Sequence, residues 1–120
     1  MPRYIIAVVD DLFFASKIRG TAEQAGVMVG FARSADGVRE MVRQNSPSLI
    51  ICDLHSRKID PLELAKNLKV NAETQDIPVL GFCSHVQTEL QEQAKQAGFD
   101  QVIPRSVFTK NLTQILQGST

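Results

Sequence analysis

Residues 48–54 read SLIICDL, a short apolar run that ends at the carboxylate of Asp53. Similar runs lie before and after 48–52, and they are rich in Val and Ile. Apolar runs of this kind are typical of strands that are covered on both faces, as in a parallel sheet. The sequence therefore predicts five short strands, at residues 4–9, 27–31, 48–52, 77–82 and 101–103.

The segments between these runs have the spacing of amphipathic helices. Ser34 and Asp60 are candidate N-caps, and Pro61 follows Asp60 at the first helical position, which suits proline. Ser84-His85-Val86-Gln87 has the pattern of a capping box, and Gly26 is placed to end the first helix. The predicted buried stripes are Phe14, Ile18, Ala22 and Ala25; Val38, Met41 and Val42; Leu62, Ala65 and Leu68; Val86, Leu90, Ala94 and Ala97; and Phe108, Leu112, Ile115 and Leu116.

Five strands that alternate with five helices predict a (βα)5 α/β fold. Because strand–helix–strand crossovers are right-handed almost without exception, such a chain forms an open, doubly wound, five-stranded parallel sheet. Five units are too few to close an eight-unit barrel. The length of 120 residues suits a single domain, expected to span residues 1–120.

Composition excludes several classes of function. Lys plus Arg and Asp plus Glu both number 13, so the formal net charge is zero, which argues against direct nucleic-acid binding and anionic-membrane binding. The longest apolar run, residues 4–9, is too short to span a bilayer, and no signal-peptide pattern is present. We expect a cytoplasmic protein in which both cysteines, Cys52 and Cys83, are reduced.

Chemically active side chains follow four of the predicted strands, at the edge where ligands bind in open α/β sheets. They are Asp10 and Asp11, Asp53, Cys83-Ser84-His85 and Pro104-Arg105-Ser106. Each aspartate alone is explained equally well as a helix N-cap. Three neighbouring carboxylates, however, repel one another, and a hard cation such as Mg²⁺ removes that cost.

These residues and their spacing resemble the response-regulator receiver family, the CheY-like phosphoacceptor domains. The resemblance covers the whole chain and is carried by VVDD at 8–11, LIICDL at 49–54, IPVL at 77–80 and AGFDQVI at 97–103. It implies the flavodoxin-like arrangement of three layers, α/β/α.

The resemblance also implies a site. Asp53 lies at the position of the phosphoacceptor, whose carboxylate attacks a phosphoryl donor. Asp10 and Asp11 lie at the acidic pair that holds Mg²⁺, together with Asp53 and the backbone carbonyl of His55. Phosphorylation then changes protein binding at the face of the fourth helix and fifth strand. Such a chain is not an enzyme in the ordinary sense, and it performs Mg²⁺-dependent self-phosphorylation at most.

The chain departs from the family pattern at the residues that sense the phosphate. Cys83 stands where the family usually has Thr or Ser, and a thiol is a poor hydrogen-bond donor, so Ser84 is the alternative hydroxyl. Arg105 replaces the usual Lys, keeping the charge but not the shape. Val102 stands at the position of the aromatic switch residue.

The loop after Asp53 departs too. The familiar Met-Pro-x-Met-Asp-Gly reads Ser56-Arg57-Lys58-Ile59-Asp60-Pro61, which adds two positive charges. These charges either attract a phosphodonor or partner or form a solvated loop.

Three functions are open from the sequence. The first is a phosphorylatable receiver, with a histidine kinase or phosphotransfer protein upstream, an unidentified protein target downstream and room for a homodimer. The second is a phosphorylation-independent pseudo-receiver that acts as a protein–protein interaction module. The third is a redox or soft-metal sensor that uses Cys83, His85 and His55.

Overall fold

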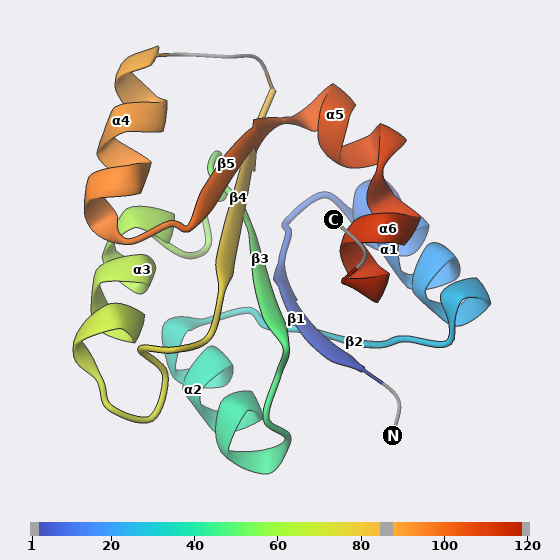
Figure 1. Ribbon diagram of the computed structural model, residues 1–120, viewed down its shortest axis with the longest axis horizontal. Helices are drawn as coiled ribbons and strands as arrows, with labels where there is room; N and C mark the ends of the chain where they lie inside the picture. The colour runs from blue at the N-terminus through green and yellow to red at the C-terminus, as the bar shows by residue number, and fades with distance from the viewer. Residues whose placement is uncertain (1–2, 85–87, 119–120) are drawn as a thin grey trace.

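The computed structural model describes residues 3–84 and 88–118, which contain a five-stranded sheet whose neighbouring strands are all parallel (Figure 1). The strands lie in the order β2-β1-β3-β4-β5. Their bounds are β1 (Tyr4–Val8), β2 (Met28–Phe31), β3 (Leu49–Asp53), β4 (Val79–Cys83) and β5 (Gln101–Pro104). The predicted doubly wound parallel sheet is confirmed.

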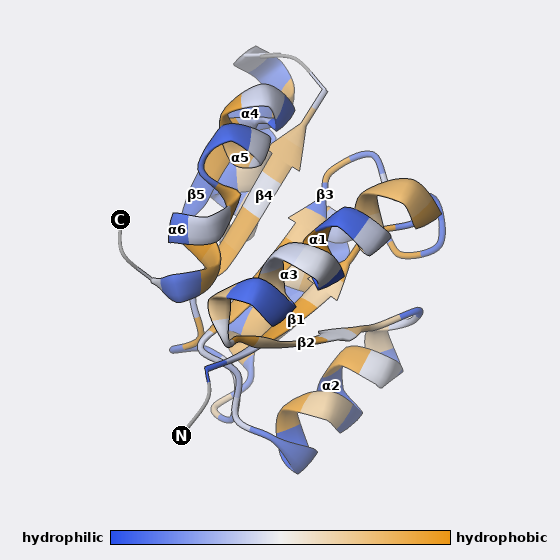
Figure 2. Cartoon of the chain, turned by 90° about the vertical axis from the view of Figure 1, so that its right-hand side faces the viewer, coloured by the Kyte–Doolittle hydropathy of each residue, from blue (hydrophilic) through white to orange (hydrophobic). Residues whose placement is uncertain are grey.

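Helices cover both faces of the sheet. Within the described residues they are α1 (Leu12–Ala25), α2 (Ala35–Gln44), α3 (Pro61–Val70), α4 (Thr88–Ala97), α5 (Arg105–Lys110) and α6 (Leu112–Gln117). α1, α5 and α6 pack on one face, and α2, α3 and α4 pack on the other (Figure 1). Figure 2 shows the consequence in colour: β1, β3 and β4 are mainly hydrophobic, whereas the helices carry hydrophilic residues on their outer sides.

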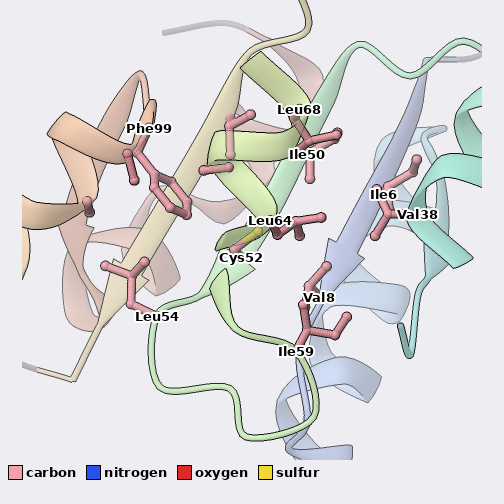
Figure 3. Packing of buried hydrophobic residues seen from close by; sticks show 14 of the residues in the cluster. Ile6, Val8, Val38, Ile50, Cys52, Leu54, Ile59, Leu64, Leu68 and Phe99 are labelled. Atoms are coloured by element: carbon pink, nitrogen blue, oxygen red, sulfur yellow. The ribbon is translucent and has the colours of Figure 1, made fainter. Parts of the chain in front are cut away.

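The apolar character of the central strands follows from this double cover. In β3, Ile50 and Cys52 point into the core beneath α2, α3 and α4, whereas Leu49 and Ile51 point into the core beneath α1 and α6. Figure 3 shows the first of these cores, where Cys52 lies beside Leu64 of α3. Because successive side chains alternate between the faces, a strand buried on both sides is apolar throughout.

All five strands differ from their expected ranges by one or two residues at an end, and two of these differences have a direct structural reason. β4 begins at Val79 rather than Ile77, because Pro78 has no N–H to donate to a neighbouring strand. β3 ends at Asp53 rather than Cys52, since Asp53 pairs with Phe82 of β4. Asp53 is thus the last residue of a central strand and takes its position from the sheet.

The expected fifth helix is divided at Asn111, which has a non-helical backbone (φ −107°, ψ 18°). The Asn111 side chain donates a hydrogen bond to the Val107 carbonyl (3.2 Å). The same carbonyl also accepts the Asn111 backbone N–H (3.0 Å), so the helical hydrogen bond is kept and the irregularity lies in the backbone angles of Asn111. The predicted stripe survives the division: Phe108, Leu112, Ile115 and Leu116 are all buried.

Helices α3 and α4 match the expectations in part. Asp60 caps α3 through bonds from the N–H groups of Leu62 and Glu63 (3.1 and 3.2 Å). The buried face includes Leu64, however, and Leu62 is only half-buried, because position 62 lies one step off that face. α4 begins at Thr88, and the expected capping box at Ser84 extends into residues 85–87, outside the described residues.

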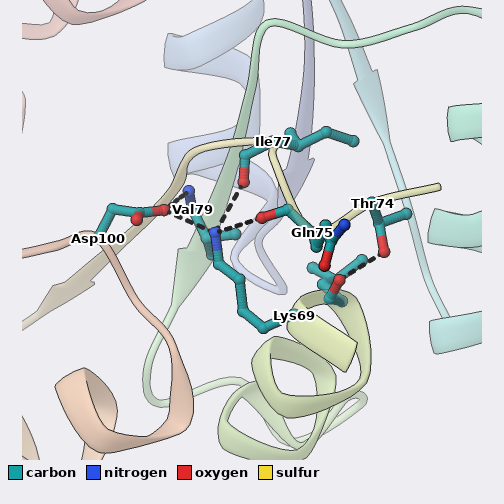
Figure 4. Close-up of polar contacts among 7 residues, drawn as sticks. Lys69, Thr74, Gln75, Ile77, Val79 and Asp100 are labelled. Carbon is teal, nitrogen blue, oxygen red and sulfur yellow. Dashed lines mark hydrogen bonds and ion pairs between the residues drawn. The ribbon is translucent and has the colours of Figure 1, made fainter. Parts of the chain in front are cut away.

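A polar cluster ties α3 to the amino-terminal ends of β4 and β5 (Figure 4). The Lys69 ammonium donates to Asp100 Oδ2 (3.0 Å) and to the Ile77 carbonyl (3.1 Å). The same Asp100 oxygen accepts the Val79 N–H (2.8 Å). Nearby, the buried Thr74 hydroxyl donates to the Leu68 carbonyl at the end of α3 (2.6 Å). The cluster fixes the ends of the strands opposite to the candidate site.

We expect Asp100→Ala to lower the free energy of unfolding by about 1–2 kcal/mol, because it leaves the Val79 N–H without its acceptor and removes the carboxylate partner of the Lys69 ammonium. Asp100→Asn should cost less, since an amide oxygen still accepts the Val79 bond. Urea unfolding measures both variants, with Asp76→Asn, an exposed position in the preceding loop, as control. Equal stability of Asp100→Ala and the wild type would show that the hydrogen bonds of Asp100 contribute nothing.

Candidate functional site

The register of the sheet gathers the predicted site residues at one edge. Chain connections run in opposite directions from β1 and β3, and these two strands pair with each other, with Val8 opposite Cys52. Such a reversal opens a crevice at the carboxyl ends of the strands. Asp10 and Asp11 follow β1 at this crevice, and Asp53 ends β3 beside them. Cys83 ends β4, opposite Pro104 of β5.

Asp11 has two structural partners. Its Oδ1 caps α1 by accepting the N–H groups of Phe13 (2.9 Å) and Phe14 (3.2 Å), and its Oδ2 lies 3.4 Å from the Arg105 guanidinium. The Phe14 N–H is the main cause that lowers the pKa of Asp11 below its ordinary value of 3.8. Burial opposes this effect, and the Phe13 N–H and Arg105 add to it.

Arg105 is held by an aromatic cluster as well as by Asp11. Its guanidinium carbon lies 4.2 Å from the centre of the Phe14 ring. Phe14 in turn contacts Phe82 of β4 and Phe108 of α5, whose rings stack with centroids 4.5 Å apart. A planar guanidinium can stack on an aromatic ring, whereas an ammonium cannot. Arg at position 105 therefore makes a stacking contact with Phe14 that Lys would not make.

Asp10 is engaged by the loop between β3 and α3. Its Oδ1 accepts the Ser56 hydroxyl (2.9 Å), and its Oδ2 accepts the N–H groups of Arg57 (2.7 Å) and Lys58 (3.4 Å). Burial raises the pKa of Asp10, but these bonds and the Lys58 charge outweigh it and hold the pKa below 3.8. The carboxylate is therefore ionised, and both of its oxygens accept hydrogen bonds from the loop.

Asp53 is half-buried, and its Oδ1 accepts the His55 N–H (2.9 Å). Among the described residues, its Oδ2 accepts no hydrogen bond. The exposed His55 ring places Nε2 3.4 Å from the Ser84 hydroxyl. Ser84 therefore lies on the open side of the site, close to the residue that orients Asp53.

Cys83 lies on the other side of β4. It is buried, its Sγ is 4.0 Å from the Ile103 carbonyl, and it packs in the same core as Cys52 and Val102. Burial, with the Asp53 charge as a smaller cause, raises the pKa of Cys52 to about 12. His85 lies outside the described residues. In the part of the chain that is described, Cys83 thus faces the core and not His55.

The three aspartates and the His55 backbone supply oxygen ligands, which suit a hard cation such as Mg²⁺. Nevertheless, within residues 3–84 and 88–118 no three His, Cys, Asp or Glu side chains are grouped closely enough to hold a metal ion. Asp10 is turned to its loop, and Asp11 to α1 and Arg105. The donors have the right chemistry, but metal binding requires Asp10 or Asp11 to exchange partners.

The sequence pattern of the response regulator receiver domain matches residues 5–117. The chain belongs to this family. It is a receiver domain of two-component signalling, and receiver domains in such systems interact with kinases or phosphotransfer proteins.

Relatives of this receiver domain share its length and fold. The polar-differentiation response regulator DivK of Brucella anthropi is 24% identical over 98% of this chain and 95% of DivK. The chemotaxis response regulator CheY4 of Vibrio cholerae superposes with a TM-score of 0.84 over 100% of both chains, at 18% identity. The receiver domain of the sensor histidine kinase PA1611 of Pseudomonas aeruginosa PAO1 superposes with a TM-score of 0.82 over 98% and 97% of the two chains, at 15% identity, and that structure has magnesium coordinated in its active site cleft.

Two contacts in this receiver domain escaped the sequence analysis. Phe14 was expected only as a buried helix residue, yet it also supports Arg105, and no spacing signal links residues so far apart in the chain. The Ser56 hydroxyl on Asp10 was missed as well. The sign of this contact in the sequence is the polar residue Ser56, at a loop position where the family usually has methionine.

A cavity of about 100 Å³ lies beside Asp10 in the receiver domain. Its charged lining consists of Asp10, Arg19, Arg33 and Lys58, three cations against one carboxylate. This side of the crevice is therefore positive.

In the described part of the chain, no helix is both long and apolar enough to cross a membrane.

The thiols of the native receiver domain should be inert. We expect neither Cys52 nor Cys83 to react with a disulfide reagent at pH 8 until the protein unfolds, because a thiol with a pKa of about 12 has roughly a thousandfold less thiolate than a free cysteine and Cys83 is only 3% exposed. Absorbance of the released reagent measures the rate. Fast native labelling that Cys83→Ala abolishes would instead support the sensor hypothesis.

Acid should destabilise the metal-free receiver domain through Asp10 and Asp11. Because their folded-state pKa values are lowered, the stability they contribute is present above the unfolded-state value near 3.8 and is lost as pH falls through the folded-state values. Urea unfolding from about pH 5 to about pH 2 measures this loss. Asp10→Asn should flatten the curve and Asp76→Asn should not; identical slopes for both would contradict the assignment.

Proposed function

We propose that this receiver domain accepts a phosphoryl group on Asp53 and thereby changes its binding to a protein partner. The position of Asp53 carries the proposal. It ends β3 at the crevice, has one carboxylate oxygen held by the His55 N–H, and leaves the other without a hydrogen bond from the described residues. An oriented carboxylate with one available oxygen suits nucleophilic attack.

In this reaction a carboxylate oxygen of Asp53 forms a bond to phosphorus. The bond between phosphorus and the donor's leaving group breaks, and the leaving group departs with the electron pair. Arg105 lies at the same edge, where its fixed guanidinium can stabilise the charge of the transferring group. The positive lining of the neighbouring cavity favours the approach of an anionic donor.

Asp10, Asp11, Asp53 and the His55 carbonyl are the residues that would hold Mg²⁺. The ion would neutralise charge on the phosphoryl group and on its carboxylate neighbours. Magnesium in the active site cleft of the PA1611 receiver domain supports this part of the proposal. The upstream donor would be a histidine kinase or a phosphotransfer protein, and the chain would act in the cytoplasm.

The response to phosphate would differ from the usual one. Cys83 and Val102 carry no hydroxyl, and both are buried in the core beneath α2, α3 and α4. Ser84 is exposed beside His55 and is the hydroxyl that we assign to the new phosphate. The signal would then pass through the segment that joins β4 to α4.

One observation favours the alternative of a phosphorylation-independent pseudo-receiver. Both oxygens of Asp10 are occupied by the loop at residues 56–58, and no metal-binding group is assembled within the described residues. A chain that keeps this arrangement permanently would retain the fold as an interaction module and lose phosphoryl transfer.

Mass spectrometry of the intact protein distinguishes the two functions. After incubation with Mg²⁺ and acetyl phosphate and an acid quench, we expect a single phosphate adduct. It should be absent in Asp53→Asn, because the amide is a far weaker nucleophile, and absent without Mg²⁺.

Asp76→Asn is the matched control, because Asp76 is an exposed aspartate at the opposite edge of the sheet. It should form the adduct as the wild type does. Failure of the wild type with acetyl phosphate, phosphoramidate and a phosphorylated histidine phosphotransfer domain, while Mg²⁺ still binds, would reject the phosphoacceptor function and favour the pseudo-receiver.

A further inference from the structure

Residues 56–58, here called the 56–58 loop, form a small anion-binding turn around the Asp10 carboxylate. One hydroxyl and two backbone N–H groups converge on it, from Ser56 (2.9 Å), Arg57 (2.7 Å) and Lys58 (3.4 Å). These residues lie 46 to 48 positions away in the sequence. The contact is therefore tertiary, and it joins the end of β1 to the segment between β3 and α3.

The two shorter bonds depend on the residue types in the loop. Only a side chain with a hydroxyl can make the bond that Ser56 makes to Oδ1, and methionine at this position would remove it. The Arg57 bond needs a backbone N–H, which proline does not have. Both donors thus exist because this loop reads Ser-Arg where Met-Pro is familiar, so the contact belongs to this chain's own sequence.

The loop is anchored at both ends, so the Asp10 contact determines the position of its middle. At its start the Ser56 N–H donates to the Asp53 carbonyl (3.0 Å). At its end Ile59 is buried, and its N–H lies 3.4 Å from the Ser56 hydroxyl oxygen. Between these anchors Arg57 and Lys58 are exposed. Release of Asp10 would free the segment that carries both cations.

We propose that the 56–58 loop and Mg²⁺ compete for the Asp10 carboxylate, so that the loop is a metal-responsive element of the site. This inference rests on the Mg²⁺ site of the proposed function. A carboxylate that rotates toward a cation moves its oxygens away from the donors that now hold them, and a hydrogen bond to an ionised group is among the stronger ones. Binding of Mg²⁺ then releases the Ser56 hydroxyl and the Arg57 N–H and repositions the two cations.

Mg²⁺ titrations followed by NMR of the ¹⁵N-labelled full chain test this competition. We expect Ser56→Ala to bind Mg²⁺ more tightly, by several-fold up to on the order of tenfold, because one competing hydrogen bond is gone. Ser56→Thr keeps the hydroxyl and should match the wild type. Arg57→Pro removes the second donor and should also tighten binding. In the wild type, the Arg57 amide should exchange with solvent faster when Mg²⁺ is bound.

The outcomes decide between the alternatives. Detectable binding only in Ser56→Ala and Arg57→Pro would support the competition, since the loop then blocks the wild-type site. Unchanged or weaker affinity in both variants, or no Mg²⁺ binding by any of the proteins, would overturn it. The phosphate adduct on Asp53 is scored separately. Competition without an adduct would reject the proposed function alone. An adduct on Asp53, together with Mg²⁺ affinities that do not change in Ser56→Ala and Arg57→Pro, would reject the competition alone.

Discussion

The pairing of β1 with β3 is the constraint on which the site depends. These strands lie side by side in the middle of the sheet, and each is buried on both faces, so a shift of register by one residue would turn every core side chain to the wrong layer. The same register sets Asp10 and Asp11 beyond β1 next to Asp53 at the end of β3. Burial of Ile6, Val8, Ile50 and Cys52 in this register therefore also positions the three carboxylates.

The fold could be predicted from the sequence because its signals are local and repeated. A doubly buried strand is apolar throughout, as in residues 48–52, and a capped helix start such as Asp60-Pro61 is visible in a few letters. The break at Asn111 was not predicted, because the buried stripe continues across it and only the backbone angles of Asn111 reveal it. Periodicity reports which face is buried, not whether the backbone along that face is continuous.

The site was predictable only as a set of residue types at one edge. Their partners depend on tertiary geometry: Arg105 stacks on Phe14, 91 positions earlier, and Asp10 bonds a loop that precedes α3. Cys83 and Ser84 show the limit most clearly. They are adjacent in sequence and opposite in orientation, with one in the core and one beside His55, because successive side chains at a strand end point to opposite sides.

The three carboxylates also show how a cation-binding edge is stabilised by the protein's own donors. Each aspartate has a separate source of positive potential: the 56–58 loop for Asp10, the start of α1 and Arg105 for Asp11, and the His55 N–H for Asp53. Their mutual repulsion is thereby relieved in the described chain. An ion or phosphoryl group that enters the site must bind more strongly than these hydrogen bonds do. The carboxylates that it binds must then release their present donors. Because Asp10 holds a loop and Asp11 holds a helix start and an arginine, their release would transmit occupancy of the site to the surface without Cys83 or Val102.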